Sequence, residues 1–297
     1  MDNKFPGKDV SDDDLKTRLP LVAKKDPDHS TVIQIGGIEV GGDLIPVFAG
    51  PNTVENEKMI IETARAVKKS GAHFLRGGAF KPLTFPYRNE KFFETREEGL
   101  SWLAKAKKEV GIPIVTEVMH TDKVEIVAEV ADILQIGTRN MQNYPLLEAV
   151  GEAGKPVMLK RHFGCSLRDW LGAAEYILNV GNHQVILCER GITAPHTHRS
   201  TSRFLLDLQV LPAAHEITHL PIITDPSHAT FRREWVKDMC LASIAGGADG
   251  IMLEVHPDPE NSAVDPLQAI GFNVFDSLMV SMEHIAKAVN RTVGRPT

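Results

Sequence analysis

Short apolar runs alternate along this chain with longer segments of helical periodicity. The apolar runs are rich in β-branched residues and lie at 44–48, 73–76, 112–117, 132–136, 156–160, 184–188, 220–224 and 250–255. Between them, segments such as 58–70 and 100–110 repeat apolar positions every three to four residues, which is typical of helices. Nearly continuous apolar strands separated by helices predict a parallel sheet covered by helices.

Eight strand-and-helix units over about 250 residues match a (β/α)8 TIM barrel, which we predict for residues 44–297. An open doubly wound sheet is the alternative, but no G-x-G-x-x-G motif opens a helix after a strand. Residues 31–43 alternate apolar and small residues around Gly36 and Gly37, which predicts a β-hairpin that closes the barrel bottom. Residues 1–30 are expected to form an N-terminal arm.

The composition is that of an ordinary globular protein without a nucleic-acid or membrane partner. The 297 residues are 42% hydrophobic, with a formal net charge of −6. Nucleic-acid-binding proteins usually present a basic surface, and a membrane-spanning helix needs roughly 18 consecutive apolar residues, which are absent here. The charged N-terminus has no signal-peptide core, and three widely spaced cysteines suggest neither disulfides nor zinc, so we expect a cytoplasmic protein.

Reactive side chains follow the apolar runs, where (β/α)8 barrels build their active sites. They are Asn52, Arg76, Lys81, Thr116, Glu117, Gln135, Arg139, Lys160, Arg161, Glu189, Arg190, Asp225, His228, Glu254 and His256. Six are basic, and like charges that share one partly desolvated mouth repel unless anions bind there. The sequence therefore predicts a small phosphorylated acid as ligand. Alternatively, some cations form salt bridges with Glu117, Glu189 and Glu254 and only support the barrel rim.

Six ordered motifs carry a family resemblance. They are RGGAFKP (76–82), DILQIGTRNMQN (132–143), LKR (159–161), ILCERGI (186–192), DPSHAT (225–230) and EVHPDPE (254–260). Together they resemble the barrel of short, type I-beta-like 3-deoxy-D-arabino-heptulosonate 7-phosphate (DAHP) synthases, relatives of 3-deoxy-D-manno-octulosonate 8-phosphate (KDO8P) synthases. The resemblance covers about residues 31–290 and implies an enzyme, usually a homotetramer, that condenses phosphoenolpyruvate with an aldose phosphate and releases inorganic phosphate.

The resemblance also assigns roles to single residues. It implies that Lys81, Arg139, Lys160 and Arg190 hold phosphoenolpyruvate by its phosphate and carboxylate. We expect the whole substrate site to comprise Arg76, Lys81, Thr84, Gln135, Arg139, Lys160, Arg161, Arg190 and Arg203. The expected catalytic residues are Asn52, Lys81, His228 and Asp265.

Members of this family commonly hold a divalent metal with a cysteine, a histidine, a glutamate and an aspartate. Here His228, Glu254 and Asp265 match the last three, but the family string AGPCSVE reads AGPNTVE (49–55), with Asn52 in place of the cysteine. A neutral amide oxygen in place of a thiolate weakens a site for zinc or iron. Metal-independent KDO8P synthases resemble this chain in carrying asparagine there.

We therefore expect catalysis without a tightly bound metal, in which Lys81, Asn52 and ordered water orient the aldehyde. The alternative is a weak Mn²⁺ or Mg²⁺ site formed by His228, Glu254, Asp265 and the Asn52 carbonyl. Asn52 could also cap the following helix, with Glu55 completing a capping box.

The loops for the second substrate, an aldehyde sugar, depart from the family pattern. KPRTSPY reads KPLTFPY (81–87), so Leu83 and Phe85 replace an arginine and a serine on either side of Thr84. A leucine cannot bind phosphate. The stretch at 193–203 is longer than its RTFEKATR-like counterpart, although Arg203 matches the last arginine.

These departures leave three possibilities for the acceptor and its product. The acceptor is not erythrose 4-phosphate, or a rearranged pocket makes the usual heptulosonate, or the barrel binds phosphorylated ligands without turnover. In a rearranged pocket the phosphate-binding candidates are Arg203, Arg88, His196, His198 and Arg199.

Overall fold

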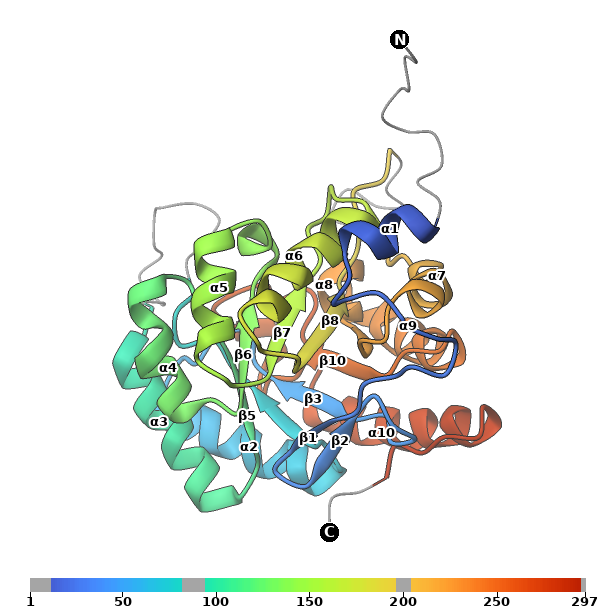
Figure 1. Ribbon diagram of the computed structural model, residues 1–297. Helices are drawn as coiled ribbons and strands as arrows, with labels where there is room; N and C mark the ends of the chain where they lie inside the picture. Colours follow the sequence, from blue (N-terminus) through green and yellow to red (C-terminus); the bar gives the residue numbers. More distant parts are fainter. Residues whose placement is uncertain (1–11, 82–93, 196–203, 295–297) are drawn as a thin grey trace.

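A closed barrel of eight parallel strands forms the body of the protein (Figure 1). The computed structural model describes residues 12–81, 94–195 and 204–294. The barrel strands are β3 (Val47–Gly50), β4 (Phe74–Arg76), β5 (Ile114–Glu117), β6 (Ile133–Ile136), β7 (Val157–Lys160), β8 (Val185–Glu189), β9 (Ile222–Thr224) and β10 (Gly250–Glu254). Each overlaps one predicted apolar run, and β10 pairs with β3 to close the ring.

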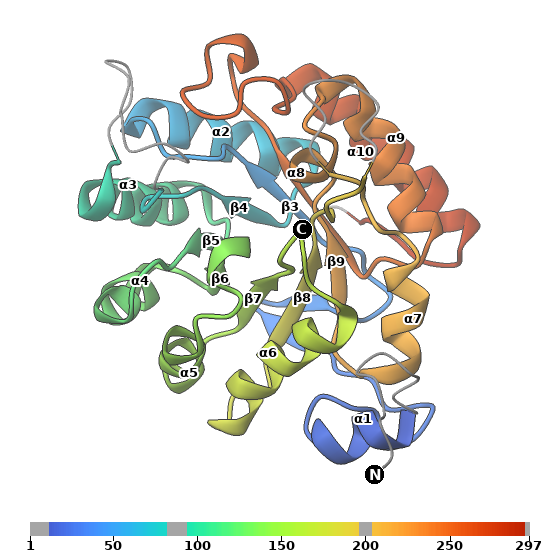
Figure 2. The same ribbon diagram turned by 90° about the horizontal axis from the view of Figure 1, so that it is seen from above.

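Helices surround the strands when the barrel is seen along its axis (Figure 2). They are α2 (Glu57–Ser70), α3 (Arg96–Val110), α4 (Val124–Val130), α5 (Tyr144–Glu152), α6 (Leu167–Asn179), α7 (Val210–Ile217), α9 (Arg233–Ala245) and α10 (Phe272–Ala288). The short α8 (Pro226–Thr230) follows β9 directly, and η1 (Thr121–Lys123), η2 (Thr138–Asn140) and η3 (Pro259–Asn261) are single 3₁₀ turns. This arrangement is the predicted (β/α)8 fold.

Successive side chains along each strand point to opposite faces of the sheet and so form two cores. One position from every strand joins a single inner cluster, which therefore fills the barrel: Phe48, Phe74, Val115, Ile133, Met158, Ile186, Ile223 and Met252. The alternate positions, such as Leu159 and Leu187, belong to the larger core between strands and helices. In six of the eight strands the inward position two residues beyond the inner cluster is polar, and these six positions form the floor of the candidate site.

An antiparallel hairpin of β1 (Ile33–Ile35) and β2 (Ile38–Val40) packs on the inner cluster through Ile33, Ile35 and Val40. It contacts the end at which the barrel strands begin, opposite to the polar floor (Figure 1). The preceding segment, which includes α1 (Asp12–Arg18), lies along α6, where Glu175 accepts hydrogen bonds from the backbone N–H groups of Leu21 and Val22. No helix in the described ranges is long and apolar enough to cross a membrane.

Candidate active site

A layer of buried polar side chains lies at the carboxyl ends of the strands. Its inward members are Arg76, Glu117, Gln135, Lys160, Asp225 and Glu254. Each stands two residues beyond an inner-cluster residue of its own strand, so the period of two in the strands points all six toward the barrel axis. Five of these six residues carry ionisable side chains, and together they bring ion pairs into a desolvated volume.

Glu254, at the end of β10, has several polar groups close to one carboxylate oxygen. Its Oε1 lies 2.5 Å from Gln268 Nε2, 3.0 Å from His228 Nε2 and 3.3 Å from Arg76 Nη1. Burial raises the pKa of Glu254 to about 7, although the Arg76 guanidinium lowers it. At neutral pH this carboxyl group therefore exchanges a proton readily and suits proton transfer.

Lys160, Asp225 and His228 form a second buried group beside Glu254. Lys160 Nζ lies 2.5 Å from Asp225 Oδ2, and His228 Nδ1 lies 2.7 Å from the same oxygen. Burial would raise the pKa of Asp225, but His228 and Lys160 hold it well below its usual value. Burial lowers the pKa of His228 well below its usual value. We therefore assign an ionised Asp225 beside a neutral imidazole.

Lys81 and Gln135 converge on Glu117 at the end of β5. Lys81 Nζ and Gln135 Nε2 each lie 3.4 Å from Glu117 Oε2. Gly137 makes room for this carboxylate, because a Cβ there would lie 1.9 Å from Glu117 Oε1. The Lys81–Glu117, Arg161–Glu189 and Arg76–Glu254 contacts are the ion pairs of the rim-supporting alternative. The basic cluster is thus partly neutralised before any anion binds.

Asn52 lies between Asp265 and Arg76. Its Nδ2 donates to Asp265 Oδ2 at 2.9 Å, and its Oδ1 accepts from Arg76 Nη2 at 3.4 Å. A guanidinium can only donate and an ionised carboxylate can only accept, so these neighbours fix which end of the amide faces which. The expected cap at Asn52 is wrong: α2 begins at Glu57, and the side chain of Asn56 caps it by accepting from Met59 N–H. The nearer asparagine satisfies the helix end, which leaves Asn52 for the site.

Three of the four expected metal-ligand positions come together. Ligand atoms of His228, Glu254 and Asp265 lie within 4.8 Å of one another and could hold a metal ion. Glu254 Oε2 is buried without a hydrogen-bond partner, which suits a cation or a proton. Asn52 does not fit as a fourth ligand, because its oxygen faces Arg76 and its N–H group faces Asp265. A cation here would also lie close to the Arg76 guanidinium, which is unfavourable.

Arg161 differs from its neighbour Lys160, because adjacent strand positions face opposite sides of the sheet. Its Nη1 lies 2.9 Å from Glu189 Oε2 and 2.8 Å from Asp207 Oδ2, and its Nη2 donates to the Cys165 carbonyl at 3.2 Å. All three partners are protein groups. Arg161 therefore braces the outside of the barrel in this structure.

The remaining expected residues are placed less centrally or are not described. Arg190 is buried, and its guanidinium lies 4.3 Å from the ring centre of Phe204. Arg139 is exposed on η2, above the end of β6. Thr84 and Arg203 lie outside the described residues, as do the other acceptor-loop candidates Leu83, Phe85, Arg88, His196, His198 and Arg199.

Sequence reasoning missed Gln268, which is fully buried and donates to Glu254. A polar residue within the short segment LQAIGF (267–272) was the available signal. It also missed the partner of His256, whose Nε2 lies 3.1 Å from Glu55 Oε1. The His256–Glu55 contact joins segments 201 residues apart, whereas Gln268 and Glu254 are 14 residues apart.

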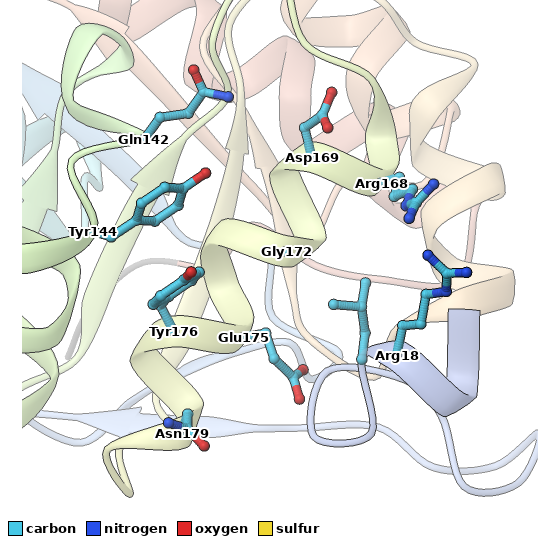
Figure 3. A pocket seen from close by; sticks show the side chains of 10 residues that line it. Arg18, Gln142, Tyr144, Arg168, Asp169, Gly172, Glu175, Tyr176 and Asn179 are labelled. Atoms are coloured by element: carbon cyan, nitrogen blue, oxygen red, sulfur yellow. The ribbon is translucent and has the colours of Figure 1, made fainter. Parts of the chain in front are cut away.

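A groove of about 360 Å³ lies on the outer surface between α1, α5 and α6 (Figure 3). Tyr144 and Tyr176 stack there with ring centres 4.3 Å apart, on the other side of Gly172 from Arg168 and Arg18. None of the polar residues at the strand ends lines it. The groove is therefore separate from the candidate active site, where buried ion pairs and shifted pKa values occur together, as they often do at functional sites.

Known proteins resemble this chain over most of its length. Phospho-2-dehydro-3-deoxyheptonate aldolase of Thermotoga maritima is 40% identical over 289 residues, covering 97% of this chain and 84% of the relative. A crystal structure of that aldolase (DAHP synthase) superposes with a TM-score of 0.86 at 41% identity, over 92% of this chain and 78% of the other.

Two further comparisons extend the likeness. A truncated form of 3-deoxy-D-arabino-heptulosonate 7-phosphate synthase from Thermotoga maritima gives a TM-score of 0.84 at 40% identity, over 93% of this chain and 99% of that one. A 2-dehydro-3-deoxyphosphooctonate aldolase of Syntrophobacter fumaroxidans is 27% identical, covering 88% of this chain and 94% of the relative. Residues 22–291 match the model of the DAHP synthetase I family, and the chain belongs to that family.

Proposed function

We propose that this protein condenses phosphoenolpyruvate with an aldose phosphate and forms a 3-deoxy-2-ketoulosonate phosphate and inorganic phosphate, as a DAHP synthase does. The observation that carries the proposal is the convergence of Lys160, Arg76 and Lys81 at one barrel mouth in a chain 40% identical to such an enzyme. Cations placed there suit the phosphate and carboxylate of phosphoenolpyruvate.

The reaction forms one C–C bond and one C–O bond and breaks one C–O bond. C3 of phosphoenolpyruvate attacks the aldehyde carbon, water adds to the cationic C2, and the phosphate leaves with its bridging oxygen as C2 becomes a ketone. One proton of the water ends on the former aldehyde oxygen and the other on the phosphate. Lys160, Arg190, Arg139 and Lys81 are proposed to hold the two anionic groups, which fixes the position of C3. His228 lies between Asp225 and Glu254 and is placed to pass a proton between them.

We further propose that the reaction needs no tightly bound metal. The Asn52 amide gives one N–H to Asp265 and has a second N–H, where a metal-dependent relative would present a ligand, and this second N–H can hold the aldehyde oxygen directly or through water. If a metal does bind, His228, Glu254 and Asp265 would hold it, and it would act as a Lewis acid on that oxygen. Activity that survives exhaustive chelation supports the proposal; activity that returns only with added Mn²⁺ contradicts it.

Phosphate release from phosphoenolpyruvate, with the product identified by mass spectrometry, tests the main proposal. The aldehyde panel should contain erythrose 4-phosphate, arabinose 5-phosphate and their unphosphorylated forms, because the KPLTFPY loop leaves the acceptor open. Lys160→Met should abolish turnover, whereas Lys58→Met on the exposed face of α2 should not. Binding of phosphoenolpyruvate without phosphate release from any aldehyde would instead support a non-catalytic barrel.

The family resemblance also favours a homo-oligomer, a tetramer or a dimer. Light scattering of the purified protein at several concentrations tests this expectation. A monomer at every concentration would contradict it.

A further inference from the structure

Two loops that are distant in sequence meet at the candidate site. The loop between β3 and α2 carries Asn52, and the loop between β10 and α10 carries Asp265, whose Oδ2 accepts from Asn52 Nδ2 at 2.9 Å. Asp265 has a φ of 51°, which residues other than glycine seldom adopt. Such a conformation persists only where neighbouring contacts hold it. The contacts that hold the Asp265 loop therefore matter to the site.

Glu55 connects these two loops. It follows Asn52 by three residues, and its Oε1 accepts from the Ala263 backbone N–H at 2.8 Å and lies 3.1 Å from His256 Nε2. Ala263 stands two residues before Asp265. The side chains of Glu55 and His256 are only 20% and 5% exposed, so solvent screens this contact weakly.

The part of the loop after Asp265 is held by other groups. Arg233 donates its backbone N–H to the Leu267 carbonyl at 2.8 Å and its Nη2 to the Pro266 carbonyl at 2.5 Å. Arg233 begins α9, so these bonds tie the loop to that helix. They do not set its distance from Asn52, whereas the Glu55 contact does.

We propose that Glu55 is a positioning residue that sets the geometry between Asn52 and Asp265. The proposal rests on the proposed function, since it concerns the aldehyde side of that site. Without the Glu55 carboxylate, the Ala263 N–H and His256 lose their acceptor, and Asp265 can leave its strained conformation. The Asn52 amide then loses its partner. Lys160 lies on β7, across the barrel from β3, and keeps its contact with Asp225.

Steady-state kinetics and amide hydrogen exchange on three variants test this role. Glu55→Ala should lower kcat about tenfold and leave the KM for phosphoenolpyruvate within about twofold. The reason is that it disturbs the arrangement of Asn52 and Asp265 rather than the binding of phosphoenolpyruvate. It should also speed exchange at Ala263, whose N–H loses its acceptor. Glu55→Gln keeps an acceptor oxygen and should stay within about threefold of wild type. Glu57→Ala is the matched control, since Glu57 pairs with Lys105 on the exposed start of α2.

A double variant separates positioning from general stability. If Glu55 acts through Asp265, then Glu55→Ala should cost nothing further in an Asp265→Ala background. Full additivity of the two losses, or wild-type kcat in Glu55→Ala, would overturn the proposal. If the wild-type protein turns over no aldehyde, the proposed function fails, but hydrogen exchange at Ala263 still tests the positioning role of Glu55. Faster exchange in Glu55→Ala supports that role, and unchanged exchange overturns it.

Discussion

The amide of Asn52 meets Asp265 with its nitrogen, 2.9 Å from the carboxylate, and Arg76 with its oxygen. This orientation uses both ends of the amide and gives the site a hydrogen-bond donor at the position where the family pattern predicts a cysteine. The buried Arg76 guanidinium enforces it, since turning the amide over would set two donors against each other.

Replacing Asn52 by cysteine should therefore create a metal site. A thiolate completes a four-ligand set with His228, Glu254 and Asp265 that suits zinc or a similar ion. We expect Asn52→Cys to bind zinc about tenfold or more tightly than wild type in calorimetry, and to become sensitive to chelators. Asn179→Cys, an exposed position on α6, is the control and should gain neither property. Equal metal content in Asn52→Cys and wild type would contradict the assignment.

Arg161 should prove structural rather than substrate-binding. Arg161→Met leaves Glu189 buried without its cation, which should lower the free energy of unfolding by about 3–5 kcal/mol. The KM for phosphoenolpyruvate of the folded variant should stay within about twofold of wild type. Denaturant unfolding and steady-state kinetics measure the two effects.

Two comparison variants make the Arg161 result specific. Arg65→Met removes a largely exposed pair with Glu109 and should cost at most about 1 kcal/mol. Lys160→Met should instead bind phosphoenolpyruvate much more weakly. A large rise in KM for Arg161→Met would return Arg161 to the substrate site.

The Lys160–Arg161 pair shows which part of the site can be predicted from the sequence and which part cannot. Periodicity predicted all eight barrel strands, and the rule that active residues follow strands predicted the layer that contains Lys160 and Asp225. The sequence does not say which of these two adjacent basic residues faces inward. The structure does, because Met158 lies in the inner cluster and Lys160, two residues later, therefore points to the same side. Gln268 contacts the end of the strand that precedes its own loop, and Glu55 contacts a loop 208 residues away, and no periodic pattern in the sequence predicts either contact.

Gly137 should be required for activity more than for stability. An added Cβ would lie 1.9 Å from Glu117 Oε1, the flexible end of a side chain that is less buried than Glu189, so displacing this carboxylate should cost less folding free energy than Arg161→Met. Lys81 and Gln135 would lose their shared partner. We expect Gly137→Ala to lower kcat about tenfold, with a small change in Tm.

Gly172→Ala is the control for Gly137→Ala. It lies inside α6 with open space around its missing Cβ, so Gly172→Ala should raise stability by up to about 1 kcal/mol through helix propensity alone. Its activity should equal that of wild type. A Gly137→Ala enzyme with normal kcat would show that Glu117 does not need its present position.

His73 should make the barrel sensitive to acid. It is buried beside β3, where its Nδ1 accepts from the Val47 backbone N–H at 3.1 Å, and burial lowers its pKa to about 4. The folded state therefore resists protonation that the unfolded chain accepts near pH 6.5, so the stabilisation is complete above pH 6.5 and is lost as the pH falls toward 4. The loss should reach about 3 kcal/mol. Denaturant unfolding between pH 7 and 4 should show a shallower pH dependence in His73→Asn than in wild type, and an unchanged dependence in His284→Asn, an exposed position on α10. Equal slopes in all three proteins would sink the assignment to His73.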